Sequence, residues 1–369
     1  MSMMSVSGWK GRDAAIESLL AVARRETLVL AIAAEAGDEE AGAVAAARLR
    51  GAIGAARPLI LALGAEAVGG AGGAGGAGGA GGAGGAGLRH ELSELPETPH
   101  DRRAQHWAAQ LDRIANRAQG WFTDQPARSL HAIAARVDQR GGDPAMPARG
   151  APGDLGMRGA LDASHRRLVD LDLDDLELHH IVLHDATLTE ITARRARLDA
   201  ADARATRWLR CRLDRSSLAT AVFAGGALDR CDLVRANLEA TSWHRAETSH
   251  CQLGRATLID ARLDHAAFTD CNLRGADLEI VRSPRVASLA GARFVRCDLR
   301  ETNWSGRELG GATFVDCKLF GAHGAPRLNG VVIERPDISL LADGSRLAAP
   351  GEVAAAWRTM IGAVAAAKA

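Results

Sequence analysis

The residues best suited to chemistry are six cysteines, which are all the cysteines of the 369-residue sequence. They repeat an interval of twenty residues that is broken once: Cys211, Cys231, Cys251, Cys271, Cys297 and Cys317. Thiols form disulfides, bind metals and carry redox chemistry. An interval of twenty, however, provides no Cys-X-X-Cys pair and no tetrahedral ligand set. We therefore interpret them as a column of reduced side chains that pack as small apolar groups, and we expect neither a metal nor a cofactor.

A second candidate group is the histidine cluster His179, His180 and His184, which Asp185 follows. Imidazole and carboxylate groups bind metals and move protons. His179 and His184 are five residues apart, and the repeat described next places them on adjacent outer faces. Side chains that diverge around a corner do not meet at one metal ion. We interpret the cluster as a solvated surface and predict no catalytic residue.

The cysteine interval indicates a solenoid, because a rare residue that returns at a constant long interval marks a chain that returns to the same place. Within residues 166–322 an apolar residue recurs at every fifth position over long stretches, with a small residue two positions before it. Typical units read CDLVR (231–235), ANLEA (236–240) and CNLRG (271–275). A period of five matches neither the 3.6 residues of a helical turn nor the alternation of a strand.

These units resemble the A(D/N)LXX motif of the pentapeptide-repeat family, over roughly Arg166 to Ala322. The resemblance implies a four-sided β-helix in which five residues form one face and four faces form a coil of about twenty residues. We therefore predict an α + β-solenoid fold: a helical N-terminal region, a right-handed quadrilateral β-helix of about seven coils, and a C-terminal capping helix. Inward columns such as Phe268, Phe294 and Phe314 are expected to stack and fill the interior, leaving no pore.

The five-residue repeat shifts once, because Cys271 and Cys297 are 26 residues apart. Six residues inserted within Glu279–Val286 restore every column. Insertions in solenoids form loops on one face and often bind partners. The candidate partner-binding loop comprises Arg282, Ser283, Pro284 and Arg285. The alternative is a tolerated insertion without a function.

Charge is distributed unevenly along the repeats. The first coil is acidic and carries Asp170, Asp172, Asp174, Asp175 and Glu177. The next two coils carry a candidate basic surface that comprises Arg194, Arg195, Arg197, Arg204, Arg207, Arg210, Arg212 and Arg215. Such a bipolar rod favours docking of a protein partner. The alternative is a solvated face whose charges compensate one another locally.

Composition and helical periodicity divide the rest of the chain. Residues 1–68 are predicted to form a helical hairpin region, with helices at about 11–36 and 39–56 and a short third helix that begins at Pro58. The further predicted segments are a flexible Gly/Ala tether at 69–87, a helical segment at 88–140, a linker at 141–160, the solenoid at 161–335 and the capping helix at 336–369. One apolar stripe of the segment 88–140 comprises Ala104, Trp107, Leu111, Ile114 and Ala118.

The predicted C-terminal helix carries Trp357, Met360, Ile361 and Val364 on one face. A solenoid has an open edge at its end, which must be covered to prevent association with other edges. We expect this face to cap the last coil. The alternative is that it pairs two rods, so the chain is expected to be a monomer or a homodimer through this helix.

Composition narrows the function. The 45 basic and 45 acidic residues balance, so we expect no direct binding of nucleic acid. We identify no signal peptide and no apolar run of about 18 residues, which favours a cytoplasmic protein. We predict that the chain is not an enzyme but a scaffold or adaptor for a protein partner, without a small-molecule substrate. Two alternatives are kept: a DNA-mimic modulator of DNA gyrase or topoisomerase of the quinolone-protection type, which the family resemblance implies, and a membrane-associated adaptor held by the N-terminal helices.

Overall fold

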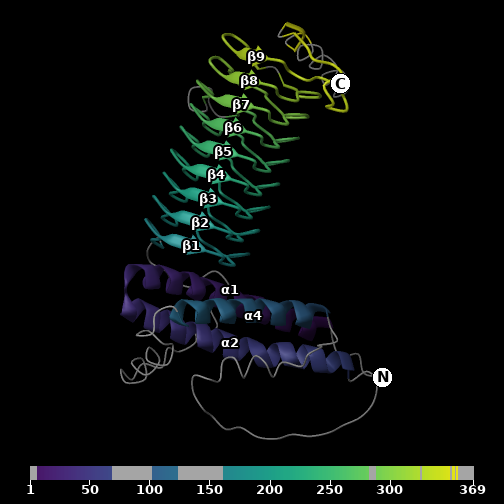
Figure 1. The fold of residues 1–369 in the computed structure, drawn as a ribbon. Coiled ribbons are helices and arrows are strands. Elements are labelled where there is room, and N and C mark those ends of the chain that lie inside the picture. Colours follow the sequence, from purple (N-terminus) through teal and green to yellow (C-terminus); the bar gives the residue numbers. More distant parts are fainter. Residues whose placement is uncertain are drawn as a thin grey trace, which may run out of the picture. The chain divides into compact units, whose positions relative to one another are not determined.

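The computed structural model describes residues 6–68, 102–123, 161–281, 288–324, 326–349, 351–353 and 355. The predicted tether at 69–87 and the predicted linker at 141–160 lie outside these residues. The chain divides into two compact units, a helical unit within residues 1–156 and a solenoid beyond them. Figure 1 shows the helices and the solenoid.

The described residues of the helical unit form three helices: α1 (Val6–Ala36), α2 (Glu39–Val68) and α4 (Arg102–Thr123). The predicted boundary between α1 and α2 is confirmed. Gly37 has a φ of 72°, which favours glycine at the end of a helix. The Asp38 carboxylate accepts a hydrogen bond of 3.0 Å from the Ala41 N–H, and so caps the first turn of α2.

The prediction of a third helix at Pro58 was wrong, because α2 runs through this residue without a break. A proline inside a helix loses one hydrogen bond and costs about 3 kcal/mol. Pro58 lies on the exposed side of α2. Beyond it, Ile60 and Leu63 are buried in the core of the helical unit. Their burial favours continuing the helix and offsets the local cost.

The three helices pack around a core of small apolar side chains. The seam between α1 and α2 is rich in alanine, with Ala23, Ala45 and Ala46 almost fully buried. The predicted stripe of α4 is confirmed, since every member is buried: Ala104, Trp107, Leu111, Ile114 and Ala118. The Trp107 indole N–H donates a hydrogen bond of 2.8 Å to the Glu17 carboxylate, which ties α4 to α1.

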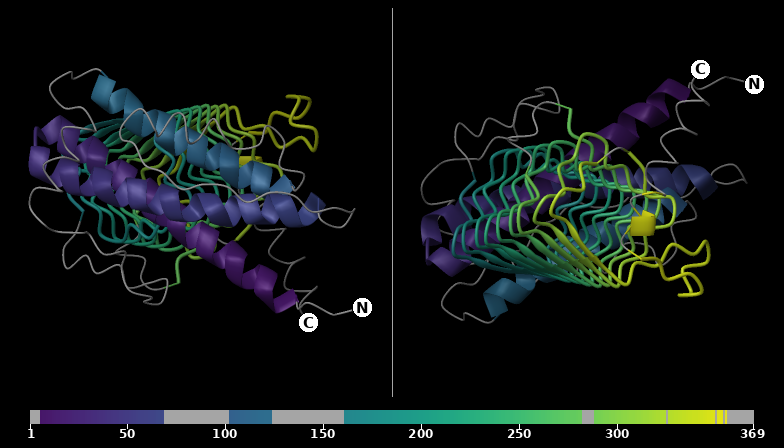
Figure 2. Two further views of the ribbon diagram at one scale, coloured as in Figure 1. Left: turned by 90° about the horizontal axis from the view of Figure 1, so that it is seen from below. Right: turned by 90° about the horizontal axis from the view of Figure 1, so that it is seen from above.

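The solenoid is built on one parallel sheet of nine strands, each paired with the next along the chain (Figure 1). The strands are β1 (Arg167–Val169), β2 (Thr187–Thr189), β3 (Arg207–Leu209), β4 (Ala227–Asp229), β5 (Glu247–Ser249), β6 (Ala267–Thr269), β7 (Arg293–Val295), β8 (Thr313–Val315) and β9 (Val332–Glu334). They give about eight turns, which confirms the predicted β-solenoid. Figure 2 views the solenoid along the direction in which its coils are stacked, so that successive coils overlie one another.

Each coil has one face with a three-residue strand and three faces joined only by single parallel bridges, such as Glu177↔Arg197, Val182↔Asp202 and Thr192↔Arg212. The corners between faces use the left-handed conformation. Every fifth residue from His165 to Gly275 has a positive φ, between 52° and 68°. This conformation costs roughly 1–2 kcal/mol for a residue other than glycine. The cost is offset because the N–H at each corner donates to a carbonyl of the next coil, as Asp185 does to Arg204 at 3.0 Å.

The interior of the solenoid is filled by columns of like side chains. The predicted phenylalanine stack is confirmed. The Phe268 and Phe294 rings lie 5.1 Å apart and the Phe294 and Phe314 rings 5.0 Å apart, with nearly parallel planes. Trp243 and Phe223 stack at 4.6 Å within the same core. All five rings are almost completely buried. Chemistry that needs a bound substrate must therefore take place on the outside of the coils.

The strand pairing locates two departures from the twenty-residue coil. Ala267 of β6 pairs with Arg293 of β7, 26 residues later, which confirms the predicted six-residue insertion. A second departure was missed from the sequence. Thr313 of β8 pairs with Val332 of β9, only 19 residues later. Since Asn303 still pairs with His323 at an interval of twenty, the missing residue falls just after His323.

Gly324 makes this shortened coil possible. It has a φ of 92°, and a Cβ atom built on it would lie 2.4 Å from the Ser305 N and 2.8 Å from the Trp304 C. The backbone of the shortened coil therefore passes directly against the coil before it. Only a residue without a side chain fits this approach.

We expect Gly324→Ala to lower the free energy of unfolding by about 1–3 kcal/mol, because backbone atoms must move to admit the methyl group. The matched control is Gly225→Ala. Gly225 also has a positive φ, but a Cβ there meets no atom within 4 Å. The control should lose only about 1 kcal/mol for the left-handed backbone. Urea unfolding followed by circular dichroism measures both; equal losses would contradict this account.

Candidate functional site

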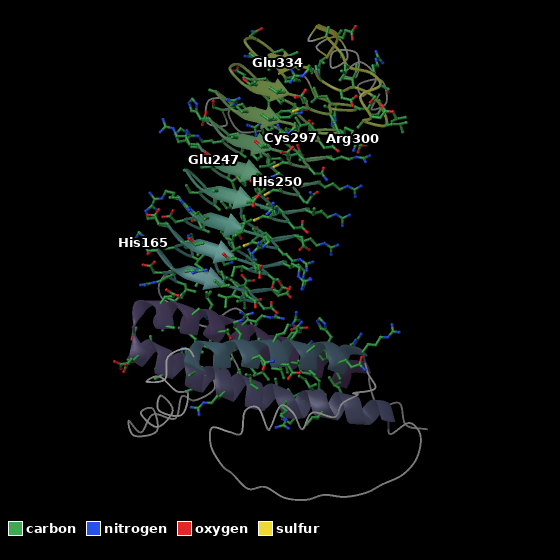
Figure 3. All side chains as sticks on the ribbon, viewed as in Figure 1. His165, Glu247, His250, Cys297, Arg300 and Glu334 are labelled. Carbon is green, nitrogen blue, oxygen red and sulfur yellow. The ribbon has the colours of Figure 1, made fainter. Side chains whose placement is uncertain are left out.

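The predicted cysteine column is present and buried. All six cysteines are free thiols, and each is at most 2% exposed. Their sulfur atoms run along the solenoid, where Figure 3 labels Cys297. Each thiol donates to carbonyls of its own coil and of the coil before, as Cys251 does to Ser249 at 3.2 Å and to Leu228 at 3.6 Å. The column therefore contributes hydrogen bonds and packing inside the solenoid.

The surroundings of the column shift the pKa of its thiols in both directions. Hydrogen bonds with Cys211 and Cys251, reinforced by burial, raise the pKa of the Cys231 thiol. Equivalent contacts with Cys271 and Cys317, again with burial, raise the pKa of the Cys297 thiol. A nucleophilic or metal-binding cysteine needs the opposite shift and access to solvent. Hydrogen bonds with Cys251 and Cys297 lower the pKa of the Cys271 thiol to about 4, but this thiol, like the others, has almost no access to solvent. Burial therefore favours packing over reactivity.

We expect the native protein to react slowly with Ellman's reagent at pH 8, and all six thiols to react once guanidinium unfolds the chain. Arg230→Cys is the positive control, because the Arg230 side chain is 62% exposed. It should add one thiol that reacts at once in the folded protein. Rapid reaction of several thiols in the unmodified native chain would contradict a buried column.

The histidine cluster lies on the surface, as predicted. His179 Nε2 lies 2.7 Å from a Glu177 carboxylate oxygen, and His184 Nε2 lies 3.1 Å from an Asp185 oxygen. The two histidines thus have separate carboxylate partners. Among the residues that the structure describes, no group of three His, Cys, Asp or Glu side chains is arranged to hold a metal ion.

The candidate basic surface is largely neutralised by ion pairs between coils. Four of its eight arginines contact a carboxylate twenty residues earlier, one coil before, in the pairs Arg194–Asp174, Arg195–Asp175, Arg197–Glu177 and Arg210–Glu190. Arg204 pairs with Asp202 of its own face at 2.6 Å, and hydrogen bonds from Arg204 lower the pKa of the Asp202 carboxyl. Within the described parts of the chain, Arg207, Arg212 and Arg215 have no ion pair.

The same pairing continues to the other end of the solenoid. Arg296 contacts Asp270 at 2.7 Å and lowers the pKa of its carboxyl through a hydrogen bond. Arg335 contacts Asp316 at 2.6 Å with the same effect. Exposed pairs of this kind contribute little stability each. Their effect is to cancel charge along the rod, so an arginine without such a partner stands out.

The candidate loop residues Arg282, Ser283, Pro284 and Arg285 lie outside the described residues, and their role remains a prediction. The described residues beside the insertion show how the solenoid accommodates it. Arg307 is fully buried there, although its position in the repeat is occupied by small residues such as Ala261 in other coils. Burial lowers the pKa of Arg307 to about 10, which leaves the guanidinium charged at neutral pH.

Arg307 replaces the hydrogen bond to the Leu278 carbonyl that the insertion disrupts. In an uninterrupted coil the N–H three residues after each centre donates back to that centre, as Ala261 does to Leu258 at 3.1 Å. At the insertion the Val281 N–H instead donates to the Asp260 carboxylate at 2.9 Å. Arg307 Nε donates to the Leu278 carbonyl in its place. Its Nη1 and Nη2 donate to Ala261 and Leu258 at 2.8 and 3.1 Å.

We therefore expect Arg307 and the insertion to depend on each other. Arg307→Ala should cost roughly 2–4 kcal/mol of stability, because buried carbonyls lose their donors. Deleting residues 281–286 should restore the regular turn, in which a backbone N–H donates to the Leu278 carbonyl. Arg307 would then be a buried charged side chain that is no longer needed as the donor to this carbonyl. In that shortened chain Arg307→Ala should raise stability instead. Denaturant unfolding of the four proteins measures this reversal of sign.

Arg262→Ala is the control for that comparison, since Arg262 is a half-exposed arginine paired with Asp264 in the same region. It should change stability little in either chain. If Arg307→Ala destabilises the shortened chain as much as the full one, the two features are independent and the assignment fails.

The predicted face of the C-terminal helix, Trp357, Met360, Ile361 and Val364, also lies outside the described residues. The part that is described is a short helical stretch at 351–353 and 355, in which Val353 is 1% exposed. Capping and dimer formation through this helix therefore remain predictions.

Two features, one buried and one on the surface, were missed from the sequence although signals for both are present. Arg307 breaks the rule that a small residue stands two positions before each centre. The run Gly225-Gly226-Ala227 places three minimal side chains at one corner. These residues line a hollow of about 560 Å³ together with charged side chains of neighbouring coils.

A family model described as "Pentapeptide repeats (8 copies)" matches residues 249–279. These residues are pentapeptide repeats. The match and the regular coils confirm the family resemblance that the motif indicated. No curated protein matches the chain significantly.

The pentapeptide repeats of this chain are also similar to several solved structures. QnrB1, a plasmid-mediated fluoroquinolone resistance protein, is 21% identical over 45% of this chain and 88% of its own, with a TM-score of 0.28. HetL, a pentapeptide repeat protein involved in heterocyst differentiation regulation from the cyanobacterium Nostoc sp. strain PCC 7120, is 21% identical over 50% of this chain and 91% of its own, with a TM-score of 0.21. A pentapeptide repeat protein from the Arabidopsis thaliana thylakoid lumen is 22% identical over 27% of this chain and 63% of its own, with a TM-score of 0.19.

None of the helices that the structure describes is both long enough and apolar enough to cross a bilayer.

Proposed function

We propose that this chain is a non-catalytic scaffold or adaptor whose solenoid presents its outer surface to a protein partner. The observation that carries the proposal is the filled interior. Each inward column consists of packed side chains, from the thiols to rings such as Phe294, that are almost wholly buried. Such a core stabilises the rod but encloses no substrate.

The regular coils also suit the outer surface to recognition. Outward side chains repeat at the strand spacing of about 4.8 Å, so their positions relative to one another are fixed by the backbone ladder. A rigid surface loses little conformational entropy when a partner binds. Charge cancellation between coils, as in Arg195–Asp175, confines any electrostatic preference to the charges that remain without a partner.

The two alternatives have less support. A mimic of duplex DNA requires rows of acidic side chains, whereas here arginines such as Arg194 and Arg210 neutralise the acidic rows. A membrane-associated adaptor requires an apolar surface on the N-terminal helices. Their large apolar residues Leu30, Ile60 and Leu63 are instead buried in the core of the helical unit. We keep a cytoplasmic scaffold, monomeric or dimeric through the C-terminal helix, as the proposal.

The test is affinity capture with the full chain as bait, followed by isolation of any complex of defined stoichiometry by size-exclusion chromatography with light scattering. We expect a discrete protein complex that forms again from purified components. The matched variant lacks residues 281–286 and carries Arg307→Ala, which removes the candidate loop. Loss of the complex with this variant would assign the interface to that loop.

The proposal is abandoned if no complex forms from purified components. A second measurement addresses the principal alternative. Purified chain at micromolar concentration should leave DNA supercoiling by gyrase unchanged, with and without a quinolone. Inhibition or protection in this assay would favour the DNA-mimic function over the scaffold.

A further inference from the structure

The hollow of about 560 Å³ lies at one corner of the solenoid, beside strands β2 to β5, where Figure 3 labels Glu247. Its lining comes from four successive coils and comprises Asp185, Thr187, Ala205, Arg207, Gly225, Gly226, Ala227, Arg245 and Glu247. The hollow is therefore a property of the stacked coils and does not depend on any loop.

The hollow exists because small residues replace longer ones in two outward columns. In the corner column Asp185 is followed by Ala205, Gly225 and Arg245 at intervals of twenty residues. In the strand column Thr187 is followed by Arg207, Ala227 and Glu247, which pair in register across β2 to β5. A Cβ on Gly225 meets no atom within 4 Å, so the floor opens directly to solvent.

The small residues of the floor also leave Arg207 without a carboxylate in the neighbouring coils, whereas other arginines along the rod have one. The coil before Arg207 offers Thr187 at the matching position, and the coil after it offers Ala227. Arg207 and Glu247 are therefore two strand spacings apart, about 9.6 Å between backbones. Across the described residues, Arg207, Arg245 and Glu247 form no ion pair. Asp185 differs, since it lies within 3.7 Å of the His165 and His184 rings.

We propose that this hollow binds an acidic segment of a protein partner, with a carboxylate held between Arg207 and Arg245. This inference rests on the proposed scaffold function and gives it a location. Guanidinium groups bind carboxylates through paired hydrogen bonds, and two of them on either side of an open floor attract one anion. The distance from Asp185 to Arg245 is three strand spacings, about 14 Å, which accommodates roughly four residues of extended chain.

The lining favours a peptide over other anions. Pockets for small molecules are mostly apolar and enclosed, whereas this hollow is lined by charged groups, a threonine and exposed backbone. Gly225, which is exposed, lets a partner's backbone approach closely. Glu247 and Asp185 confine the positive charge of the hollow to Arg207 and Arg245, which suits one short acidic segment better than the extended backbone of a nucleic acid.

The test uses the full chain and fluorescein-labelled tetraglutamate, with binding followed by fluorescence anisotropy at low salt. Tetraglutamine is the uncharged control peptide, and inorganic phosphate and a DNA duplex are competitors. We expect tetraglutamate to bind and tetraglutamine not to bind. Arg207→Ala and Arg245→Ala should each weaken binding about tenfold, as expected for loss of one partner in a charge pair.

Two further variants make the result specific. Ala227→Glu places a carboxylate in the coil next to Arg207, as in the ion pairs found elsewhere along the rod. It should weaken peptide binding about tenfold without unfolding the protein. Arg212→Ala removes an arginine that also lacks an ion pair in the described structure but does not line the hollow. It should leave the affinity within twofold.

The proposal is overturned if Arg212→Ala weakens binding as much as Arg207→Ala, because attraction would then be diffuse. It is also overturned if Ala227→Glu binds the peptide as the unmodified chain does, or if phosphate or DNA displaces the peptide at lower concentrations than unlabelled tetraglutamate. If a captured protein partner still binds the Ala227→Glu variant, the scaffold function stands and the hollow is not its interface.

Discussion

The hydrogen bond between one coil and the next is the interaction on which the rest of the molecule depends. At each corner of a regular coil a residue in the left-handed conformation donates its N–H to a carbonyl nineteen residues later, as His180 does to Asp199. Because this bond is repeated at every corner, it offsets a backbone conformation that is unfavourable for most residues. It fixes the length of the coil, and through the coil it fixes which side chains point inward and which share a column outside.

A structure held this way tolerates a change in coil length only where the interrupted bonds are replaced. The two departures in this chain are resolved differently. The insertion after β6 leaves the Leu278 carbonyl without its usual backbone donor, and the Arg307 side chain takes over. The deletion before β9 brings two backbones together, and Gly324 gives the space. The insertion is accommodated by a long polar side chain inside the core. The deletion is accommodated by a residue that has no side chain.

These two cases show what the sequence can and cannot indicate. The leucine and cysteine columns predicted the coil, the inward face and the insertion, because each depends on a local pattern that repeats. Pro58 misled the helix prediction, since packing of Ile60 and Leu63 overrode a local preference. Arg307 and Gly324 depend on contacts with the preceding coil, whose position is set by the changed register itself. Their roles follow only once the coils are stacked.

The stacking of the coils, which arranges the core, also decides which charged side chains lie next to one another on the outside. A side chain on the rod has neighbours in the coil before and the coil after, so many of its ion-pair partners lie about twenty positions away; others, such as Asp202 for Arg204, lie two positions away in the same coil. Arg195 and Asp175 satisfy this rule, while Arg207, with Thr187 and Ala227 at the matching positions, does not. Counting arginines in the sequence therefore overstates the basic character of the surface. The charges that carry information about a partner are those that the stacking leaves unmatched, and Arg207, Arg245 and Glu247, around a floor of glycine and alanine, are among them.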